Sequence, residues 1–213
     1  GTVAFAVCGS FCTLGAAVDL EQLRLEYSPE ELLQLFYCQF IDDGASVFGF
    51  QQLQRCMVDA WECWDDFKPF AQRPFGNRPV WLGYDPSYTG DNAAIVVLAP
   101  PAVPGGKFRI LERAQFKGMD FADQADFIRK QCERYHVEFI GIDATGIGSG
   151  VFQLVKQFRP DAVGFQYSPE VKTRLVLKAL DVINNGRLKF DAGSNDIAAA
   201  FLAIKKTVTA GGS

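Results

Sequence analysis

The pattern of apolar and polar residues changes once along the chain. From Asp19 to about Phe70 the apolar positions recur with the spacing of a helix, and a stretch containing proline and glycine, residues 68–79, follows. Beyond it the pattern changes to alternation and to short continuous apolar runs, both typical of β-strands. The change predicts a helical segment over residues 1–70 and an α/β domain over residues 71–213.

Two helices are predicted in the first part. One begins at Ser28-Pro29-Glu30-Glu31, which combines a capping hydroxyl, a proline in the first turn and acidic residues. The other covers Gln51 to Trp64. This part holds more aromatic residues than two short helices can bury between themselves, so we expect them to pack on the second part. Trp61 and Trp64 lie three residues apart, on one helical face, and both are expected in the core.

The second part begins with three predicted strands and continues with alternating helices and strands. The three strands, Val80–Tyr84, Ala93–Ala99 and Phe108–Leu111, are close enough in sequence to pair antiparallel. The later elements are a helix over 121–135, a strand over 139–142, a helix over 150–158, a strand over 162–167, a helix over 168–185, a strand over 187–190 and a helix over 196–207. This order predicts a mixed α/β sheet flanked by helices.

Composition and charge refine this division. The chain has 213 residues, 48% of them hydrophobic, which is enough to bury a core, and its mean hydropathy of +0.03 is too polar for a bundle of membrane spans. The net charge of −4 conceals an asymmetry: residues 1–70 hold 3 basic and 11 acidic residues, and residues 71–213 hold 18 and 14. The two parts therefore either face different partners or pack on each other.

The cysteine and histidine content excludes several kinds of chemistry. Six cysteines occur at positions 8, 12, 38, 56, 63 and 132, and a chain of this size needs no disulfides, so we expect them to be reduced. Cys8 and Cys12 lack a second pair of ligands for zinc. A single histidine, His136, leaves serine and cysteine without an obvious base for triad hydrolysis.

The first 18 residues contain no charge and resemble a signal peptide only superficially. They lack its basic start, and glycine, serine and threonine interrupt its apolar run. The chain also begins without methionine. We therefore expect a cytoplasmic piece of a longer protein, without membrane association.

Two similar segments carry the most informative chemistry. Trp-Leu-Gly-Tyr-Asp-Pro-Ser ends a strand at Asp85, and Phe-Ile-Gly-Ile-Asp-Ala-Thr ends another at Asp143. If these strands are neighbours, the two carboxylates lie close together, and their repulsion is relieved by a hard divalent cation such as Mg²⁺ or Mn²⁺. In the alternative interpretation each aspartate caps a turn, since Asp-Pro-Ser and Asp-Ala-Thr are both turn sequences.

Gly83-Tyr84-Asp85-Pro86-Ser87 and the Gly-Ile-Asp-Ala-Thr-Gly-Ile-Gly run at 141–148 resemble the nuclease domain of the large terminase subunit of tailed bacteriophages, which has a ribonuclease-H-like fold. The acidic segment from Tyr27 to Asp43 is similar to the segment that joins the ATPase to the nuclease in that family. The resemblance extends over roughly residues 20–210 and implies a ribonuclease-H-like mixed sheet preceded by a helical linker.

The resemblance implies a metal-dependent endonuclease that cuts concatemers of viral double-stranded DNA during packaging. Asp85 and Asp143 would be the catalytic metal ligands of a two-metal site for Mg²⁺ or Mn²⁺. The implied partners are viral double-stranded DNA, an upstream ATPase domain of the same polypeptide, the small terminase subunit and the portal or procapsid. The implied location is the cytoplasm of the bacterial host.

The chain departs from the family pattern at its end. The family has a third acidic residue near the start of a late helix, and the chain stops at Ser213 before such a position; Asp191 and Asp196 do not match the motif. We therefore expect this chain to bind divalent ions weakly and to cut DNA slowly.

Basic and glycine-rich positions are candidates for DNA contacts. Lys172, Arg174 and Lys178 lie on the helix predicted after Ser168, away from its apolar stripe, and either contact DNA phosphates or form a solvated helix face. The glycines of 146–150 either let the backbone approach the metal site or a phosphate, or simply form a tight turn.

Two other functions are open at this point. Gly-x-Asp-x-Ser/Thr followed by Asp-x-Thr-Gly also occurs in phosphotransferases and ATPases of the actin and sugar-kinase type. The second alternative is a module that keeps the fold only to dock a packaging motor and has no catalytic activity.

Overall fold

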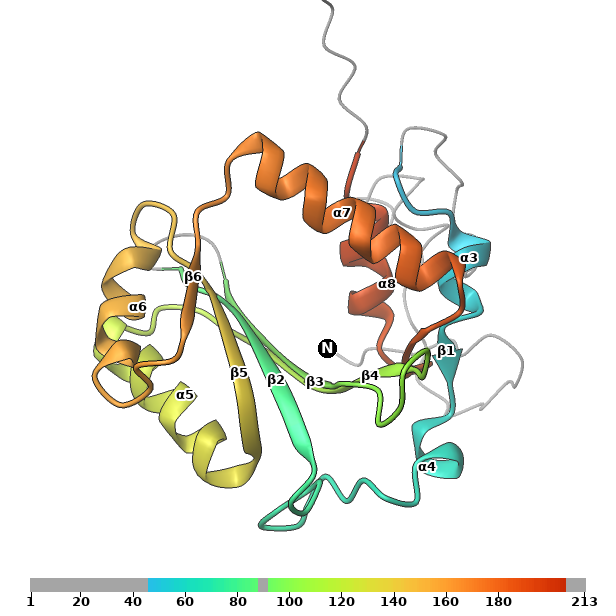
Figure 1. Ribbon diagram of the computed structural model, residues 1–213, viewed down its shortest axis with the longest axis horizontal. Coiled ribbons are helices and arrows are strands. Elements are labelled where there is room, and N and C mark those ends of the chain that lie inside the picture. Colours follow the sequence, from blue (N-terminus) through green and yellow to red (C-terminus); the bar gives the residue numbers. More distant parts are fainter. Residues whose placement is uncertain (1–45, 88–91, 206–213) are drawn as a thin grey trace, which may run out of the picture. The chain divides into compact units, whose positions relative to one another are not determined.

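The structure is a computed structural model, and it describes residues 46–87 and 92–205 (Figure 1). These residues fall into two compact units: residues 54–192, and residues 46–53 with 193–205. The helix predicted at Ser28 and the segment that resembles the linker to an ATPase lie outside the described residues. The domain boundary predicted at residue 70 stays a prediction.

The larger unit contains a seven-stranded mixed sheet with the order β1-β7-β4-β3-β2-β5-β6. Its centre is an antiparallel meander, in which β2 (Pro79–Asp85) pairs with β3 (Ala93–Ala99) and β3 pairs with β4 (Phe108–Phe116). This confirms the predicted meander. Parallel strands extend it on both sides: β5 (His136–Asp143) and β6 (Val163–Phe165) beyond β2, and β7 (Leu188–Asp191) and β1 (Met57–Val58) beyond β4.

One face of the sheet carries the main core. Alternation along β2 turns Val80, Leu82 and Tyr84 to this face, where all three are buried. Two helices cover it, α5 (Phe121–Arg134) and α6 (Gly148–Lys156), and they contribute the buried side chains of Ile128 and Val151 (Figure 1). The same alternation places Trp81, Gly83 and Asp85 on the other face of β2.

The helix α7 (Pro169–Asn184) begins at the predicted position and packs differently from α5 and α6. Its N-cap is Ser168, whose side chain accepts a hydrogen bond from Val171 N at 3.3 Å. Only Ile183 of this helix is buried. The helix therefore lies over the second face of the sheet without sealing it (Figure 1).

The helix predicted over residues 51–64 is wrong. In its place are α3 (Phe50–Gln54), β1 and α4 (Ala60–Cys63). Phe190 N of β7 donates to Cys56 O at 3.0 Å, and Asp59 caps a new helix by accepting hydrogen bonds from Trp61 N and Glu62 N. Pairing with a distant strand therefore overrides the local helical spacing.

The expected burial of two tryptophans is half right. Trp64 is buried and lies with the Arg109 guanidinium 5.5 Å from its ring, whereas Trp61 is 72% exposed. The break between α3 and α4 removes the common helical face on which the expectation depended. None of Cys56, Cys63 and Cys132, the cysteines of the described part, forms a disulfide, as expected.

The smaller unit joins the segment before β1 to α8 (Asn195–Leu202), which is shorter than the predicted helix. Ser46 Oγ donates to Leu202 O at 2.9 Å, and the rings of Phe48 and Phe201 meet edge to face with centroids 5.0 Å apart. Within the described part of the chain, no helix has both the length and the hydropathy to cross a membrane.

Candidate active site

The two similar sequence segments lie side by side in the sheet. Strands β2 and β5 are parallel neighbours whose register pairs Trp81 with Phe139, Gly83 with Gly141 and Tyr84 with Ile142. Asp85 and Asp143 are the next residues and the last of their strands. Because neighbouring strands lie about 4.8 Å apart, the structure brings these two aspartates together at one edge of the sheet.

Asp143 also organises the turn that follows it. Its Oδ1 accepts a hydrogen bond from Thr145 N at 2.8 Å, and Thr145 Oγ1 in turn accepts one from Tyr167 N at 2.9 Å. Ala144 N donates to Phe165 O at 2.9 Å. The turn-capping interpretation therefore holds for Asp143, and the cap fixes the orientation of its carboxylate beside Asp85.

The glycines after Asp143 allow helix α6 to begin against the end of β5. Gly146 has a φ of +55°, in the left-handed region that favours glycine. A Cβ on Gly148 would lie 2.1 Å from Asp143 O, which is backbone and cannot swing away. The tight-turn interpretation of these glycines is therefore sufficient, and Gly148 couples the helix to the position of Asp143.

Replacing Gly148 with alanine is expected to destabilise the protein by about 1–3 kcal/mol, since the new methyl group forces α6 away from the end of β5. Urea unfolding measures the change. Gly83→Ala is the matched control: in the described part of the chain no atom lies within 4 Å of its added Cβ, and we expect a change within about 0.5 kcal/mol. Equal stability of the two variants would contradict the argument.

A buried glutamine holds the chain on the other side of the aspartate pair. Gln124 of α5 is fully buried, and its Nε2 donates to Ser87 O at 2.7 Å and to Met119 O at 2.9 Å. Its Oε1 accepts from the Tyr84 hydroxyl at 2.8 Å. Gln124 therefore fixes Tyr84, directly before Asp85, and Ser87, two residues after it.

The phenol of Tyr167 is a further polar group at this edge. Burial raises the pKa of Tyr167, and the carboxylates of Asp143 and Asp85 raise it further. The phenol therefore stays protonated at neutral pH and is a hydrogen-bond donor. Both aspartates act on one hydroxyl, as expected if they face a common space.

The sequence did not single out either group. Gln124 is a polar residue on the buried face of an amphipathic helix, and this is the signal that could have found it. For Tyr167 the sequence indicates only that it ends a predicted strand.

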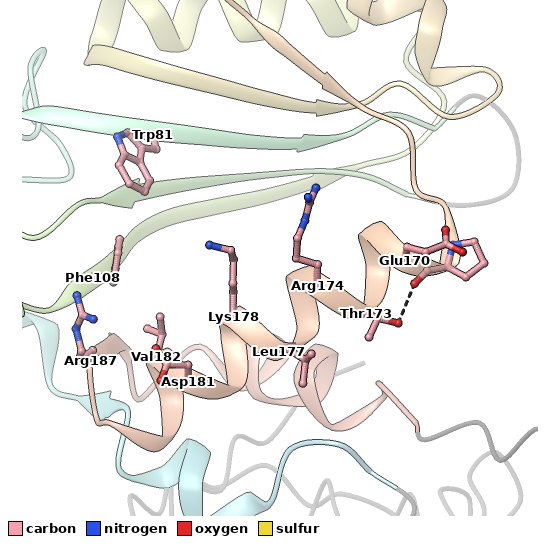
Figure 2. A pocket seen from close by; sticks show the side chains of 11 residues that line it. Trp81, Phe108, Glu170, Thr173, Arg174, Leu177, Lys178, Asp181, Val182 and Arg187 are labelled. Carbon is pink, nitrogen blue, oxygen red and sulfur yellow. Dashed lines mark hydrogen bonds between the residues drawn. The ribbon is translucent and has the colours of Figure 1, made fainter.

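Two cavities lie on the second face of the sheet, and Trp81 lines both. The larger, of about 1040 Å³, is formed by Trp81 and Phe108 on one side and α7 on the other (Figure 2). The smaller, of about 340 Å³, is lined by Gly83, Asp85 and Tyr167 and shares Trp81 with the larger. Together the two cavities follow β2 from Trp81, in the middle of the sheet, to Asp85 at its end.

The predicted basic row divides between two sides of α7. Arg174 and Lys178 line the larger cavity, and their side chains point toward the sheet (Figure 2). Lys172 is exposed and is not among the lining residues. Residues 174 and 178 are one helical turn apart, whereas 172 lies on a different side of the helix.

Asp85 and Asp143 supply oxygen ligands of the kind that Mg²⁺ and Mn²⁺ prefer. Across residues 46–87 and 92–205, no group of three or more histidine, cysteine, aspartate or glutamate residues is arranged to hold a metal ion. The candidate metal centre in this part of the chain is thus a two-carboxylate site.

The seven-stranded mixed sheet, with helices on its faces and paired aspartates at the ends of β2 and β5, defines a ribonuclease-H-like domain. The match to known proteins is more specific. Residues 82–213 match the family described as the terminase RNaseH-like domain, and the chain belongs to this family.

Two curated relatives are ATPase subunits of terminases. The terminase ATPase subunit of Escherichia phage P2 is 60% identical over 201 residues, which cover 94% of this chain and 34% of that protein. The probable terminase ATPase subunit of Haemophilus phage HP1 is 45% identical over 195 residues, 91% of this chain and 32% of that protein. The chain spans about a third of the length of these relatives.

Solved structures support the fold. The large terminase nuclease from thermophilic phage G20c with bound magnesium has a TM-score of 0.59 at 17% identity, covering 77% of this chain and 84% of that one. A mutant nuclease domain of the large terminase subunit gp2 of bacterial virus Sf6, with manganese, has a TM-score of 0.51 at 12% identity over 78% and 84%. The predicted family resemblance and fold class are confirmed.

Proposed function

We propose that the chain is the nuclease part of a viral DNA-packaging terminase and that it cuts concatemers of double-stranded DNA with divalent metal ions. The observation that carries the proposal is the juxtaposition of Asp85 and Asp143 on adjacent parallel strands in a member of the terminase RNaseH-like family. The family match favours this function over a phosphotransferase of the actin and sugar-kinase type.

Asp85 and Asp143 would hold Mg²⁺ or Mn²⁺, since both offer carboxylate oxygens at one edge of the sheet. When bound, such ions lower the pKa of the attacking water and stabilise the leaving oxygen of the phosphodiester. The chain's own groups have other roles. Thr145 N and Gln124 fix the two carboxylates and their turns, and the Tyr167 hydroxyl donates a hydrogen bond to an oxygen of the substrate.

The remaining partners follow from the length and names of the relatives. Both curated relatives are terminase ATPase subunits about three times as long as this chain. We infer that the domain works beside an ATPase domain of the same polypeptide, with the small terminase subunit and the portal or procapsid, in the cytoplasm of the bacterial host. Lys172, Arg174 and Lys178 are the proposed contacts to DNA.

A nicking assay on supercoiled plasmid tests the proposal. We expect this chain to nick DNA with Mn²⁺ and to lose the activity in EDTA. Because two carboxylates bind a divalent ion weakly, calorimetric titration should give dissociation constants of about 10⁻³ M. Tight binding of two ions would contradict the weak-site prediction. A chain of the relatives' full length that binds DNA but never nicks it would favour the docking module without catalytic activity.

A further inference from the structure

The sheet face beneath α7 carries three matched pairs of residues on β2 and β5. Trp81 and Phe139 form the first pair and Gly83 and Gly141 the second, and the two aspartates follow at the strand ends. The ring of Phe165 occupies the space above Gly141, since a Cβ there would lie 2.8 Å from Phe165 Cε2. The space above Gly83 is open: no atom of residues 46–87 and 92–205 lies within 4 Å of an added Cβ. A hollow therefore separates an aromatic platform from the aspartate edge.

The platform is half-buried, and its rings pack on one another. The Trp81 ring lies 5.8 Å from the ring of Phe108 and 6.0 Å from that of Phe139, at tilted and edge-to-face angles. Trp81 lines both cavities. A flat ligand that entered the groove would therefore meet an aromatic surface whose orientation is already fixed.

The opposite wall of the groove carries three basic and two acidic side chains: Arg174, Lys178 and Arg187, with Glu170 and Asp181. Arg174 and Lys178 point from α7 toward the sheet, and among the described residues neither has a hydrogen-bond or ion-pair partner (Figure 2). Arg187 closes the far end, with its Nε donating to Gly106 O at 3.1 Å and its guanidinium 5.6 Å from the Phe108 ring. Two uncommitted cations thus face an aromatic floor, the combination with which proteins bind single-stranded nucleic acid.

We propose that the groove between α7 and β2 binds a single strand of DNA and leads it to Asp85 and Asp143. An unstacked base lies against Trp81, and the phosphates contact Arg174 and Lys178. Trp81 and Asp85 are four residues apart on one strand, about 13 Å, so the platform holds a nucleotide close to the one that is cut. This assignment rests on the proposed nuclease function and adds a strand-separated substrate to it.

The size of the groove favours one strand over a duplex. A cavity of about 1040 Å³ is comparable to the pockets that hold small organic ligands. Bases in a duplex are stacked on each other and present only their edges in the grooves, so their faces cannot reach Trp81 without strand separation. The ligand that fits this groove is therefore a single DNA strand or the separated end of a duplex.

Binding of fluorescein-labelled oligothymidylate, followed by anisotropy in EDTA, tests the proposal. We expect the single strand to bind more tightly than a duplex of equal length. Trp81→Ala should weaken binding about tenfold. The double variant Arg174→Ala, Lys178→Ala should reduce the slope of log K against log salt by about 0.7 for each lost phosphate contact.

Matched controls separate the groove from general effects. Trp61→Ala removes an exposed tryptophan that does not line the groove, and Lys130→Ala removes an exposed cation of α5, the helix on the other face of the sheet; we expect both variants to bind as the unmodified chain does. Gly83→Leu is a second test that does not depend on how Trp81→Ala folds. It fills the hollow without removing a contact, and it should weaken binding of the single strand. Equal affinity for duplex, or normal binding by both Trp81→Ala and Gly83→Leu, would overturn the proposal.

The failure of the groove and that of the nuclease are distinguishable because EDTA prevents cleavage during binding. Normal single-strand binding by a protein that never nicks plasmid would contradict the nuclease function and support the single-strand groove. If Trp81→Ala and Gly83→Leu both nick at the normal rate and bind the single strand with unchanged affinity, the groove proposal is contradicted and the nuclease function is not.

Discussion

Replacing Asp85 with asparagine is expected to lower plasmid nicking on the order of 10³-fold while the protein stays folded. Asparagine keeps the shape of the side chain and removes the negative charge that a divalent ion requires. Asp143→Asn should have a similar effect, because its amide oxygen can still accept the hydrogen bond from Thr145 N. Groups that act as a unit are not additive, so the double variant should be no slower than the worse single one.

The control for both variants is Asp126→Asn. Asp126 is an exposed residue of α5 whose carboxylate pairs with Lys130. We expect its nicking rate to match that of the unmodified chain. Nicking by Asp85→Asn at more than about a tenth of the normal rate would show that this carboxylate is not part of the catalytic centre.

Gln124→Leu is expected to reduce the free energy of unfolding by about 2–4 kcal/mol. Leucine is similar in size but leaves Ser87 O, Met119 O and the Tyr84 hydroxyl without their buried partner, and each unpaired group is costly. Because the same bonds fix the residues around Asp85, nicking should also fall at temperatures where the variant is fully folded.

Urea unfolding with Gln115→Leu alongside separates this network from a general effect of losing a glutamine. Gln115 is exposed, and its side chain accepts a long hydrogen bond of 3.5 Å from Asn92 Nδ2. We expect a change within about 0.5 kcal/mol there. If Gln124→Leu were equally mild, the hydrogen bonds of Gln124 would not hold the Asp85 turn.

Local signals predicted most of the central sheet. The boundaries of β3 follow its continuous apolar run, and the two strands that end in aspartate were recognised by their similar sequences. The register of β2 on β5 then aligns these sequences residue by residue. The aspartate pair was thus predictable because each strand carries its own signal.

The errors lie where distant residues decide the structure. Strand β1 has two residues, too few for any periodicity, and it exists because β7 pairs with it. Without that pairing, the spacing around Trp61 and Trp64 resembles one helix. The phase of α7 was also available from the sequence, since residues four apart share a face, and it separates Lys172 from Arg174 and Lys178.

The pairing of β1 with β7 also governs the order in which the protein can assemble on the ribosome. Lys189 Nζ donates to Arg55 O across 134 residues of chain, so this edge cannot close until nearly the whole larger unit has been synthesised. The β2–β3–β4 meander, by contrast, connects neighbours in sequence and can form while translation continues. A nascent chain therefore carries an unpaired edge at β4 late into its synthesis, and a pause in translation before residue 188 would prolong its exposure to aggregation.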